Sequence, residues 1–354
     1  MSKPTFVDLF AGAGGLSYGL SQAGWKQMLA CEHWGDAVQT YKQNMPDHQI
    51  YEGDIRSLTE QLISTFISDT PDWIVGGPPC QGYSTVGKRR SDDERNNLFQ
   101  EFARVVNVLR PKNFLIENVL GMRDMSFVQP VCSYFRALGY NVSHFVLCAA
   151  DFGVPQLRRR VFFVGSANGL FFDKPNPLLT EENWVTVTDA IGDLPVLKPG
   201  EQATTYDKQP ANSYQVAMRH ASNKLQGHIA SSHPQYLVDA ISHIPDGGNR
   251  TFIPAELQPK SGFHNSYSRL DSKKPAVAVT QNMGKPSGSR CIHPFQNRGL
   301  TAREGARLQG FPDRFQFMGG STSQRLQIAN AVSPILAKAL AQKLMENHSW
   351  CEAA

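Results

Sequence analysis

The fold class is decided near the N-terminus, by the stretch Phe6-Val7-Asp8-Leu9-Phe10-Ala11-Gly12-Ala13-Gly14-Gly15. Phe6 to Leu9 have the apolar character of a buried strand, and a helix is predicted from Leu16 to about Ala23, with Gly24 as its stop. A glycine-rich turn between a strand and a helix is typical of folds that hold a nucleotide-type cofactor at the helix N-terminus. Ser17 stands where the dinucleotide fingerprint has its third glycine, which argues against NAD or FAD.

Acidic residues stand at the ends of the next two predicted strands. A strand from about Lys26 to Cys31 ends in Glu32, at the usual distance for a carboxylate that grips ribose hydroxyls. Asp54 follows a third strand, in Gly53-Asp54-Ile55. Either residue alone is read equally well as a solvated turn residue. Carboxylates in register at successive strand ends favour a cofactor site.

Cys80 has the surroundings of a nucleophile. The apolar stretch Asp72-Trp73-Ile74-Val75 leads into Gly76-Gly77-Pro78-Pro79-Cys80, where the prolines fix the backbone and the glycines permit close approach of a ligand. A second strand, Phe114-Leu115-Ile116, ends in Glu117, which places an acid at the same edge of the sheet. The alternative is an inert buried cysteine, which is the commoner role of this residue.

Strands alternate with helices through the first half of the chain, which predicts an α/β fold with an open parallel sheet. After Gly165 proline and glycine interrupt this pattern, so residues 183–300 are predicted to form a separate, irregular, β-rich domain. Helical periodicity returns at 301–309 and in a closing helix at 334–347. The further elements are expected as helices near 34–44, 57–69 and 97–110 and as strands near 141–149 and 160–165.

The distribution of charge points to a polyanionic partner. The 354-residue chain has a formal net charge of only +4. Residues 201–300 hold eleven Lys and Arg against six Asp and Glu, a net of +5 that leaves −1 for the remainder. This concentration favours neutralisation of nucleic-acid phosphates, with a solvated basic surface as the competing interpretation.

Composition also limits the compartment and the cofactors. The six cysteines show no paired spacing and the N-terminus shows no signal peptide, so a reducing cytoplasm is expected. No apolar run approaches the ~20 residues of a membrane span. The histidines, including His228 and His233, lack the spacing of metal ligands, so no metal is expected.

Taken together, the motifs of this chain resemble those of C5-cytosine DNA methyltransferases, in which they occur in the same order. The resemblance runs from Thr5 to about Leu340, apart from the variable stretch between Gly165 and Gly299. It departs from the family pattern at Ala329, where glycine is usual, and at Tyr83, where phenylalanine is commoner. Neither departure removes a group that does chemistry. The motifs are Asp8-Leu9-Phe10-Ala11-Gly12-Ala13-Gly14-Gly15, Pro79-Cys80-Gln81, Glu117-Asn118-Val119, Gln156-Leu157-Arg158-Arg159-Arg160, Leu300-Thr301-Ala302-Arg303-Glu304, Arg307-Leu308-Gln309-Gly310-Phe311-Pro312 and Gln327-Ile328-Ala329-Asn330-Ala331-Val332.

The resemblance implies a Rossmann-like class I methyltransferase sheet with helices on both faces. It implies a catalytic, S-adenosylmethionine-binding domain at 1–182 and 318–354, a target-recognition domain at 183–300 and a connecting helix region at 301–317. The implied reaction is methyl transfer to carbon 5 of a cytosine flipped out of a specific duplex DNA sequence. A monomeric bacterial modification enzyme is expected, cytoplasmic and nucleoid-associated when on DNA, with a cognate restriction endonuclease as a candidate partner.

Cytosine chemistry suggests the catalytic roles. Carbon 5 is too weak a nucleophile to take a methyl group until a thiolate, here from Cys80, adds to carbon 6. Glu117 near N3 is expected to absorb the developing charge. Arg158 and Arg160 are candidates to lower the thiol pKa from its ordinary ~8.5, and by resemblance Arg160 also reaches the cytosine O2. The catalytic set is completed by Asn118 and Gln81.

By resemblance, Phe10 stacks on the adenine, Glu32 binds the ribose and Asp54 binds the adenine amino group. His33 is expected to pack beside the adenosine, and Asn330 lies at the methionine end. The whole cofactor-binding set is Phe10, Ala11, Gly12, Gly14, Gly15, Leu16, Glu32, His33, Asp54, Ile55, Pro78, Leu98, Asn330 and Ala331.

DNA contacts are expected in two places. The polar stretch from Ser84 to Asn96 directly follows the nucleophile and has the composition of a lid over the flipped base, or of a plain surface loop. Sequence readout is expected from the recognition domain, with Tyr267-Ser268-Arg269 and Thr280-Gln281-Asn282 as candidates. The predicted DNA-binding residues are Ser84, Lys88, Arg89, Arg95, Arg269, Gln281 and Asn282.

Two rival functions remain open. The tRNA-methylating branch of the same family shares the chemistry but carries a Cys-Phe-Thr signature that is absent here. A catalytically silent DNA-binding regulator would keep the fold without the reaction. The presence of Cys80, Glu117 and Arg160 argues against that interpretation.

Overall fold

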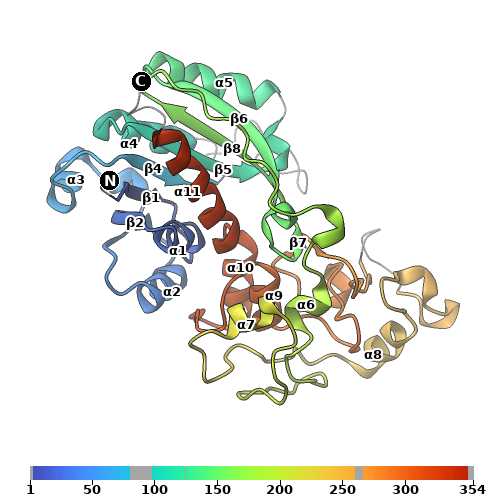
Figure 1. The fold of residues 1–354 in the computed structure, drawn as a ribbon. Helices are drawn as coiled ribbons and strands as arrows, with labels where there is room; N and C mark the ends of the chain where they lie inside the picture. Colours follow the sequence, from blue (N-terminus) through green and yellow to red (C-terminus); the bar gives the residue numbers. More distant parts are fainter. Residues whose placement is uncertain (1–2, 80–97, 124, 260–265, 350–354) are drawn as a thin grey trace. The chain divides into compact units, whose positions relative to one another are not determined.

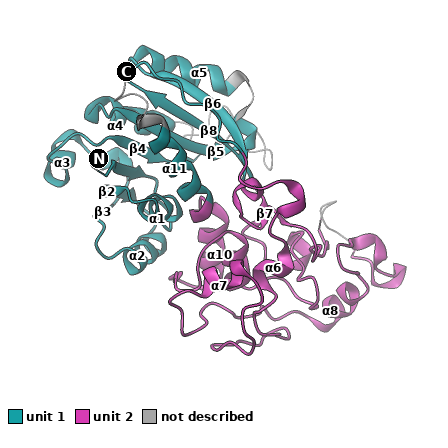
Figure 2. Ribbon diagram, viewed as in Figure 1, with its two compact units in different colours: residues 1–148, 159–176, 336–354 teal, residues 149–158, 177–335 magenta. Residues whose placement is uncertain are grey.

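A computed structural model describes residues 3–79, 98–123, 125–259 and 266–349 (Figure 1). The chain divides into two compact units (Figure 2). Unit 1 consists of residues 1–148, 159–176 and 336–354, and unit 2 of residues 149–158 and 177–335.

Unit 1 is built on a seven-stranded sheet in the order β3-β2-β1-β4-β5-β8-β6. Its strands are β1 (Thr5–Leu9), β2 (Lys26–Glu32), β3 (Ile50–Glu52), β4 (Trp73–Gly76), β5 (Asn113–Val119), β6 (Asn141–Cys148) and β8 (Arg159–Ser166). Strands β1 to β5 are parallel, whereas β8 runs antiparallel to both β5 and β6. The predicted α/β class is confirmed, and the sheet is parallel as predicted except at β8, which runs antiparallel to its neighbours. The connection 149–158 is too short for the crossover that a parallel neighbour of β6 requires.

Helices cover both faces of this sheet. They are α1 (Gly15–Gln22), α2 (Gly35–Asn44), α3 (Glu60–Phe66), α4 (Leu98–Leu109) and α5 (Met125–Ala137). Val7 and Leu9 of β1 join the apolar cluster formed with α3, α4 and α5. Asp8 lies between them and therefore points to the opposite face, where it accepts a hydrogen bond from Ser17 of α1.

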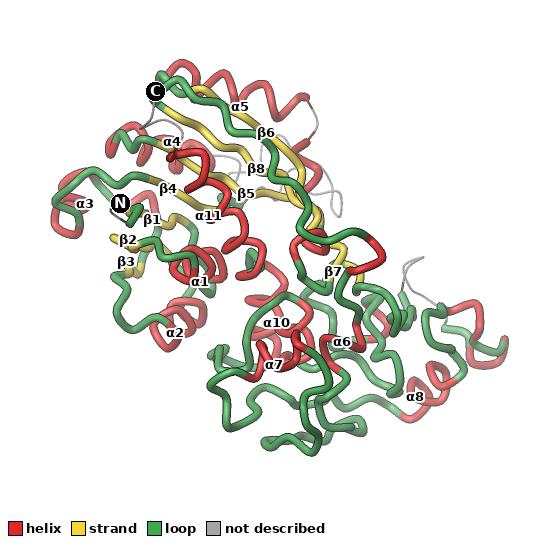
Figure 3. The backbone as a smooth tube through the Cα atoms, viewed as in Figure 1, coloured by secondary structure: helices red, strands yellow, loops and turns green. Residues whose placement is uncertain are grey.

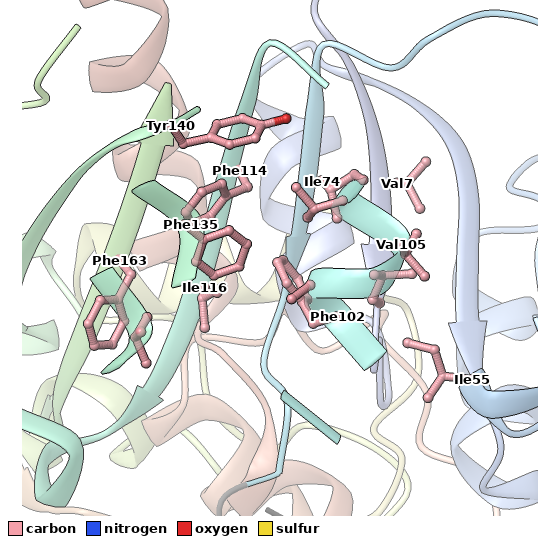
Figure 4. Packing of buried hydrophobic residues seen from close by; sticks show 14 of the residues in the cluster. Val7, Ile55, Ile74, Phe102, Val105, Phe114, Ile116, Phe135, Tyr140 and Phe163 are labelled. Carbon is pink, nitrogen blue, oxygen red and sulfur yellow. The ribbon is translucent and has the colours of Figure 1, made fainter. Parts of the chain in front are cut away.

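The main core lies between the sheet and α4 and α5 (Figure 4). Phe102 of α4 packs among Ile74 of β4 and Phe114 and Ile116 of β5, and all four side chains are fully or almost fully buried. The Phe114 ring lies 4.0 Å from that of Phe135 in α5 between centroids. Burial of one such side chain stabilises a fold by ~1.5–3 kcal/mol. This packing fixes the carboxyl ends of β4 and β5, where the predicted catalytic residues stand.

Unit 2 consists mainly of short helices and irregular segments (Figure 3). Its α-helices are α6 (Val187–Ile191), α7 (Ser213–Arg219), α8 (Gln235–Ser242), α9 (Ala302–Leu308) and α10 (Ser321–Asn330), and α11 (Pro334–Ser349) begins in it. The described part of 183–300 holds one short strand, β9 (Ala276–Val277), which pairs with β7 (Gln156–Leu157). The irregular character is as predicted, but the expected richness in strands is wrong.

Buried ion pairs, rather than a sheet, organise the interior of unit 2. Arg307 donates to both Asp193 and Asp313, with nitrogen–oxygen distances of 2.7–3.3 Å. Arg298 forms a bidentate pair with Glu304 at 2.6 and 2.8 Å. These pairs join charged residues of α9 to the irregular segments around it, so those segments pack without long strands.

The compact units do not follow the predicted domain boundaries. α10 packs on α9, so residues 318–335 group with unit 2, although the sequence places 318–354 with the cofactor domain. From Leu336 onward the chain groups with the sheet of unit 1. The roles expected for the two domains stay predictions.

Candidate active site

The glycine-rich turn after β1 depends on left-handed backbone conformations. Gly12 and Gly14 have φ angles of 56° and 90°, and Phe10 has a φ of 61°, which is strained for an aromatic residue. A Cβ on Gly14 would lie 2.3 Å from Cε of Met45 and 2.7 Å from Cδ2 of Tyr41, so a larger residue would displace these side chains in addition to straining the backbone. The turn thus brings the backbone into close contact with α2 and leaves Gly14 as the N-cap of α1.

Glu32, at the end of β2, closes this turn. Its Oε2 accepts a hydrogen bond from the Gly12 amide at 2.8 Å, and its Oε1 accepts from the amides of His33 and Trp34 at 2.8 Å each. The carboxylate is buried, while the His33 side chain is exposed with Nδ1 3.3 Å from Glu32 Oε1. Glu32 therefore shapes the loop in addition to its predicted contact with ribose.

Asp54 stands beyond β3 and is bound by its neighbour Arg56. The guanidinium and the backbone amide of Arg56 donate to both carboxylate oxygens at 2.5–3.0 Å. These hydrogen bonds lower the pKa of Asp54 to about 2. Asp54 is thus ionised at neutral pH, and its adenine contact stays a prediction.

Asp8 is a buried carboxyl group that the sequence did not single out. Its Oδ2 accepts a hydrogen bond from the Ser17 hydroxyl at 2.6 Å, and its Oδ1 has no partner among the described residues. Ser17 in turn accepts from the Tyr41 hydroxyl at 2.9 Å, and that hydroxyl lies 3.0 Å from Nδ1 of His48. Burial raises the pKa of Asp8 to about 7, against the lowering effect of the Ser17 bond.

The predicted catalytic acid lies in an ion pair at the end of β5. Glu117 Oε1 is 3.0 Å from Nε of Arg160 in β8, although this buried oxygen has no well-aligned hydrogen bond. A Cβ on Gly77 would lie 3.3 Å from Glu117 Oε2, so the carboxylate stands beside the segment that leads to Cys80. The pair thus places a carboxylate and a guanidinium at the carboxyl end of β5.

Asn118 fixes the same segment. Its amide donates to the carbonyl of Pro78 at 2.9 Å, and its own oxygen accepts from the Val119 amide at 2.9 Å. Several predicted site residues lie outside the described residues: Cys80, Gln81, Ser84, Lys88, Arg89 and Arg95.

Those residues of unit 1 that the sequence selects and the structure describes lie at one edge of the sheet. The order of strands reverses between β1 and β4, and ligands of open α/β sheets bind at such a switch point, outside the carboxyl ends of the strands. Among the remaining predicted residues there, Ala11, Leu16 and Ile55 are buried and Leu98 is half-buried at the start of α4. In the parts of the chain that the structure describes, no group of three or more His, Cys, Asp or Glu is arranged to hold a metal ion.

Other predicted residues fall in unit 2. Arg158 is buried and donates from Nη2 to the carbonyl of Ala331 at 3.2 Å, next to Asn330, which is exposed at the end of α10. The Gln156-to-Arg160 motif is therefore divided, because Arg160 belongs to the sheet of unit 1.

Gln156 is a second residue that sequence reasoning missed. Its buried amide donates to the Leu308 carbonyl at 3.0 Å and to Gln309 Oε1 at 2.6 Å, and accepts from the Val279 amide at 3.0 Å. Gln309 then donates to the Ala331 carbonyl at 2.5 Å. The chain of amides joins three of the sequence motifs to the segment before Thr280. The sign of this network in the sequence is that Gln156 and Gln309 each lie within one of the motifs.

Arg269 corrects one of the predicted DNA contacts. Its guanidinium is buried and donates to the carbonyls of Ile241, Ile244, His293 and Gln296 and to Asn297 Oδ1 at 2.6–2.9 Å. All five donors are thereby used within the protein, which leaves none for a base edge. Gln281 is exposed and Asn282 half-buried, so both stay candidates.

No helix within the described ranges is long and apolar enough to cross a membrane. The sequence matches the profile of a family described as C-5 cytosine-specific DNA methylase over residues 4–346. The Type II methyltransferase M1.HphI of Haemophilus parahaemolyticus is 40% identical over 349 residues, covering 97% of this chain and 87% of that protein. The Type II methyltransferase M.DdeI of Desulfomicrobium norvegicum is 39% identical over 375 residues, covering 97% and 88%.

A solved structure gives the same result. A protein described as a DNA modification methyltransferase encoded within an Escherichia coli prophage has a TM-score of 0.80 and 28% identity, covering 97% of this chain and 99% of that chain. The family match spans nearly the whole chain, and the two Type II methyltransferases match almost the full length of the chain at 39–40% identity. The chain therefore belongs to the C-5 cytosine-specific DNA methyltransferases.

Proposed function

We propose that this enzyme transfers a methyl group from S-adenosylmethionine to carbon 5 of a cytosine flipped out of a specific duplex DNA sequence, through a covalent bond between Cys80 and carbon 6. The observation that carries the proposal is the Glu117–Arg160 pair beside the segment that ends in Cys80. Family membership supports the reaction class, and the pair supplies the groups that this chemistry requires.

The residues act in a definite order in this proposal. The Cys80 thiolate adds to carbon 6, and Glu117 stabilises the negative charge that moves toward N3. Arg160 holds Glu117 in place and supplies positive charge near the thiolate, which favours its ionised form. Carbon 5 then takes the methyl group and loses its proton to a base, and the thiolate leaves to restore the aromatic ring.

The proposed cofactor fits the loop at the end of β1. S-adenosylmethionine supplies an electrophilic methyl group on a sulfonium. The glycine turn is narrow because of Gly14, and the Gly12 amide donates a hydrogen bond to Glu32. The backbone of the turn and the Glu32 carboxylate therefore lie together at the proposed cofactor site. Phe10, Glu32 and Asp54 would hold the adenosine, and Asn330 the methionine end.

Duplex DNA is the proposed substrate rather than tRNA. The relatives at 39–40% identity are Type II methyltransferases, and the Cys-Phe-Thr signature of the tRNA branch is absent from the sequence. The proposed enzyme acts on DNA in the bacterial cytoplasm, as a monomer. A restriction endonuclease of the same specificity is the partner that this class of enzyme suggests.

Methylation-aware sequencing of DNA from cells that express the protein tests this function. We expect 5-methylcytosine at one position of one recurring sequence, and none in cells that express Cys80→Ala. Methylation in RNA alone would favour the tRNA alternative. A lack of methylation in both nucleic acids, from soluble and folded protein, would favour the silent regulator.

A further inference from the structure

Arg325 of α10 is a buried arginine of unit 2 whose guanidinium is only partly bonded within the described part of the protein. Its side chain is buried, with 7% of the residue exposed, and Nη2 donates to the Ser231 hydroxyl at 2.7 Å. Nε has no partner among the described residues, and Arg325 takes part in no ion pair there. Arg298 and Arg307, in contrast, are each paired with buried carboxylates. An arginine buried without an anion is costly, because its desolvation is not compensated.

The guanidinium lies against the loop that carries the candidate base-reading residues. A Cβ on Gly284 would lie 2.4 Å from Cζ of Arg325, so a larger residue there would displace the guanidinium. Gln281 and Lys285 are exposed on the same loop. Nη1 forms no hydrogen bond with a described residue, so this nitrogen and Nε are the two donors of the fork not used in the described part of the protein. Burial without a carboxylate nearby also lowers the pKa of Arg325.

We propose that Arg325, with the Ser231 hydroxyl and the exposed Lys285, binds one backbone phosphate of the duplex and so positions the 280–285 loop over the bases. The planar guanidinium fork matches phosphate oxygens, and a bound phosphate supplies the anion that the free protein lacks. This proposal rests on duplex DNA as the substrate. A phosphate contact fixes the register of a protein on DNA, whereas neighbouring side chains such as Gln281 read the sequence.

The first test is the salt dependence of binding to a duplex that contains the methylated sequence. Arg325→Met is expected to weaken binding by on the order of tenfold, as one charge-assisted hydrogen bond does. It should also reduce the slope of log K against log salt by about 0.9, the value for one phosphate. Lys26→Gln is the matched control, since it removes one exposed charge at the start of β2 and should leave both quantities unchanged.

The second test locates the phosphate. Duplexes with a neutral methylphosphonate at one position are scanned along both strands. Wild-type protein should bind more weakly when the methylphosphonate stands at one particular position. Arg325→Met should bind that duplex as tightly as it binds the unmodified one. Gly284→Ala, which forces the guanidinium aside, should behave like Arg325→Met, and the double variant should be no weaker than either single variant. An unchanged scan and salt slope in both variants would overturn the proposal, while methylation by wild-type protein would leave the function itself intact.

Measurements of stability and of cofactor binding distinguish a phosphate-binding Arg325 from one that only stabilises the fold and from one that binds the cofactor. If Arg325 serves the fold, Arg325→Met lowers the melting temperature; our proposal expects a melting temperature equal to or above that of the wild type. If the anion is the carboxylate of S-adenosylmethionine, calorimetry will show weaker cofactor binding in Arg325→Met. Either result, with an unaltered methylphosphonate scan, would contradict the phosphate site.

Discussion

At the scale of single residues, burial decides what a charged side chain can do. Arg269 and Arg325 have the same chemistry and both lie in the second half of the chain. Arg269 gives every donor to the protein, whereas among the described residues Arg325 has a partner only for Nη2. The sequence alone cannot separate them, because burial depends on contacts between distant segments. The positions of Glu32 and Glu117 were predictable, since each lies where an apolar strand ends.

Asp8 gives a pH-dependent prediction. Its pKa is about 7 in the folded protein and about 3.9 in an unfolded chain, so the folded state binds the extra proton between these values. Stability from this group is complete below about pH 4 and is lost as the pH rises to about 7. Asp8→Asn keeps an acceptor for Ser17 and carries no charge, so its advantage in unfolding free energy over wild type should grow to on the order of 4 kcal/mol by pH 8.

Urea unfolding at pH 5 and pH 8 measures this difference. A difference between Asp8→Asn and wild type that is the same at both pH values would show that Asp8 does not bind a proton in this range. Asp69→Asn, in the turn before β4, is a suitable control, because that aspartate is exposed.

At the scale of elements, local patterns predicted unit 1 better than unit 2. The expected helix at 97–110 is α4, Leu98–Leu109, since its apolar face and the following proline mark it clearly. α5 was not predicted, and Pro130 lies within it. In unit 2 the order comes from side chains paired over long sequence distances, such as Arg307 with Asp193, and no periodicity reports these pairs.

The glutamine chain of unit 2 yields a prediction at this scale. Gln156→Glu replaces the amide donor to Leu308 and Gln309 with a carboxylate, which would face two acceptors. We expect a loss of about 2–4 kcal/mol in unfolding free energy near pH 8 and a lower kcat, because buried donors and acceptors are left unmatched. Both should partly recover near pH 5.5, where the introduced carboxyl group is protonated and donates again.

Chemical unfolding and single-turnover methylation at the two pH values provide the measurement. Gln342→Glu, an exposed position of α11, is the control and should show neither effect. Equal losses at both pH values would mean that the direction of the hydrogen bonds through Gln156 is unimportant.

At the scale of the whole molecule, the protein joins a sheet-based unit with a helical and irregular one, and we assign methyl transfer to the edge of the sheet. The family match over residues 4–346 and the order of the motifs support the reaction class for the chain as a whole. The central claim is that Cys80 forms a bond with carbon 6 of the target cytosine before the carbon 5 proton leaves.

Trapping with 5-fluorocytosine tests that claim most directly. Fluorine at carbon 5 cannot leave as a proton does, so the reaction should stop after methyl transfer with the DNA still attached. A duplex with this base at the target position should become covalently bound to wild-type protein only when S-adenosylmethionine is present. Cys80→Ala should form no adduct, and Glu117→Gln should form it far more slowly. Adducts that form equally without cofactor, or a crosslinked peptide that lacks Cys80, would contradict the mechanism.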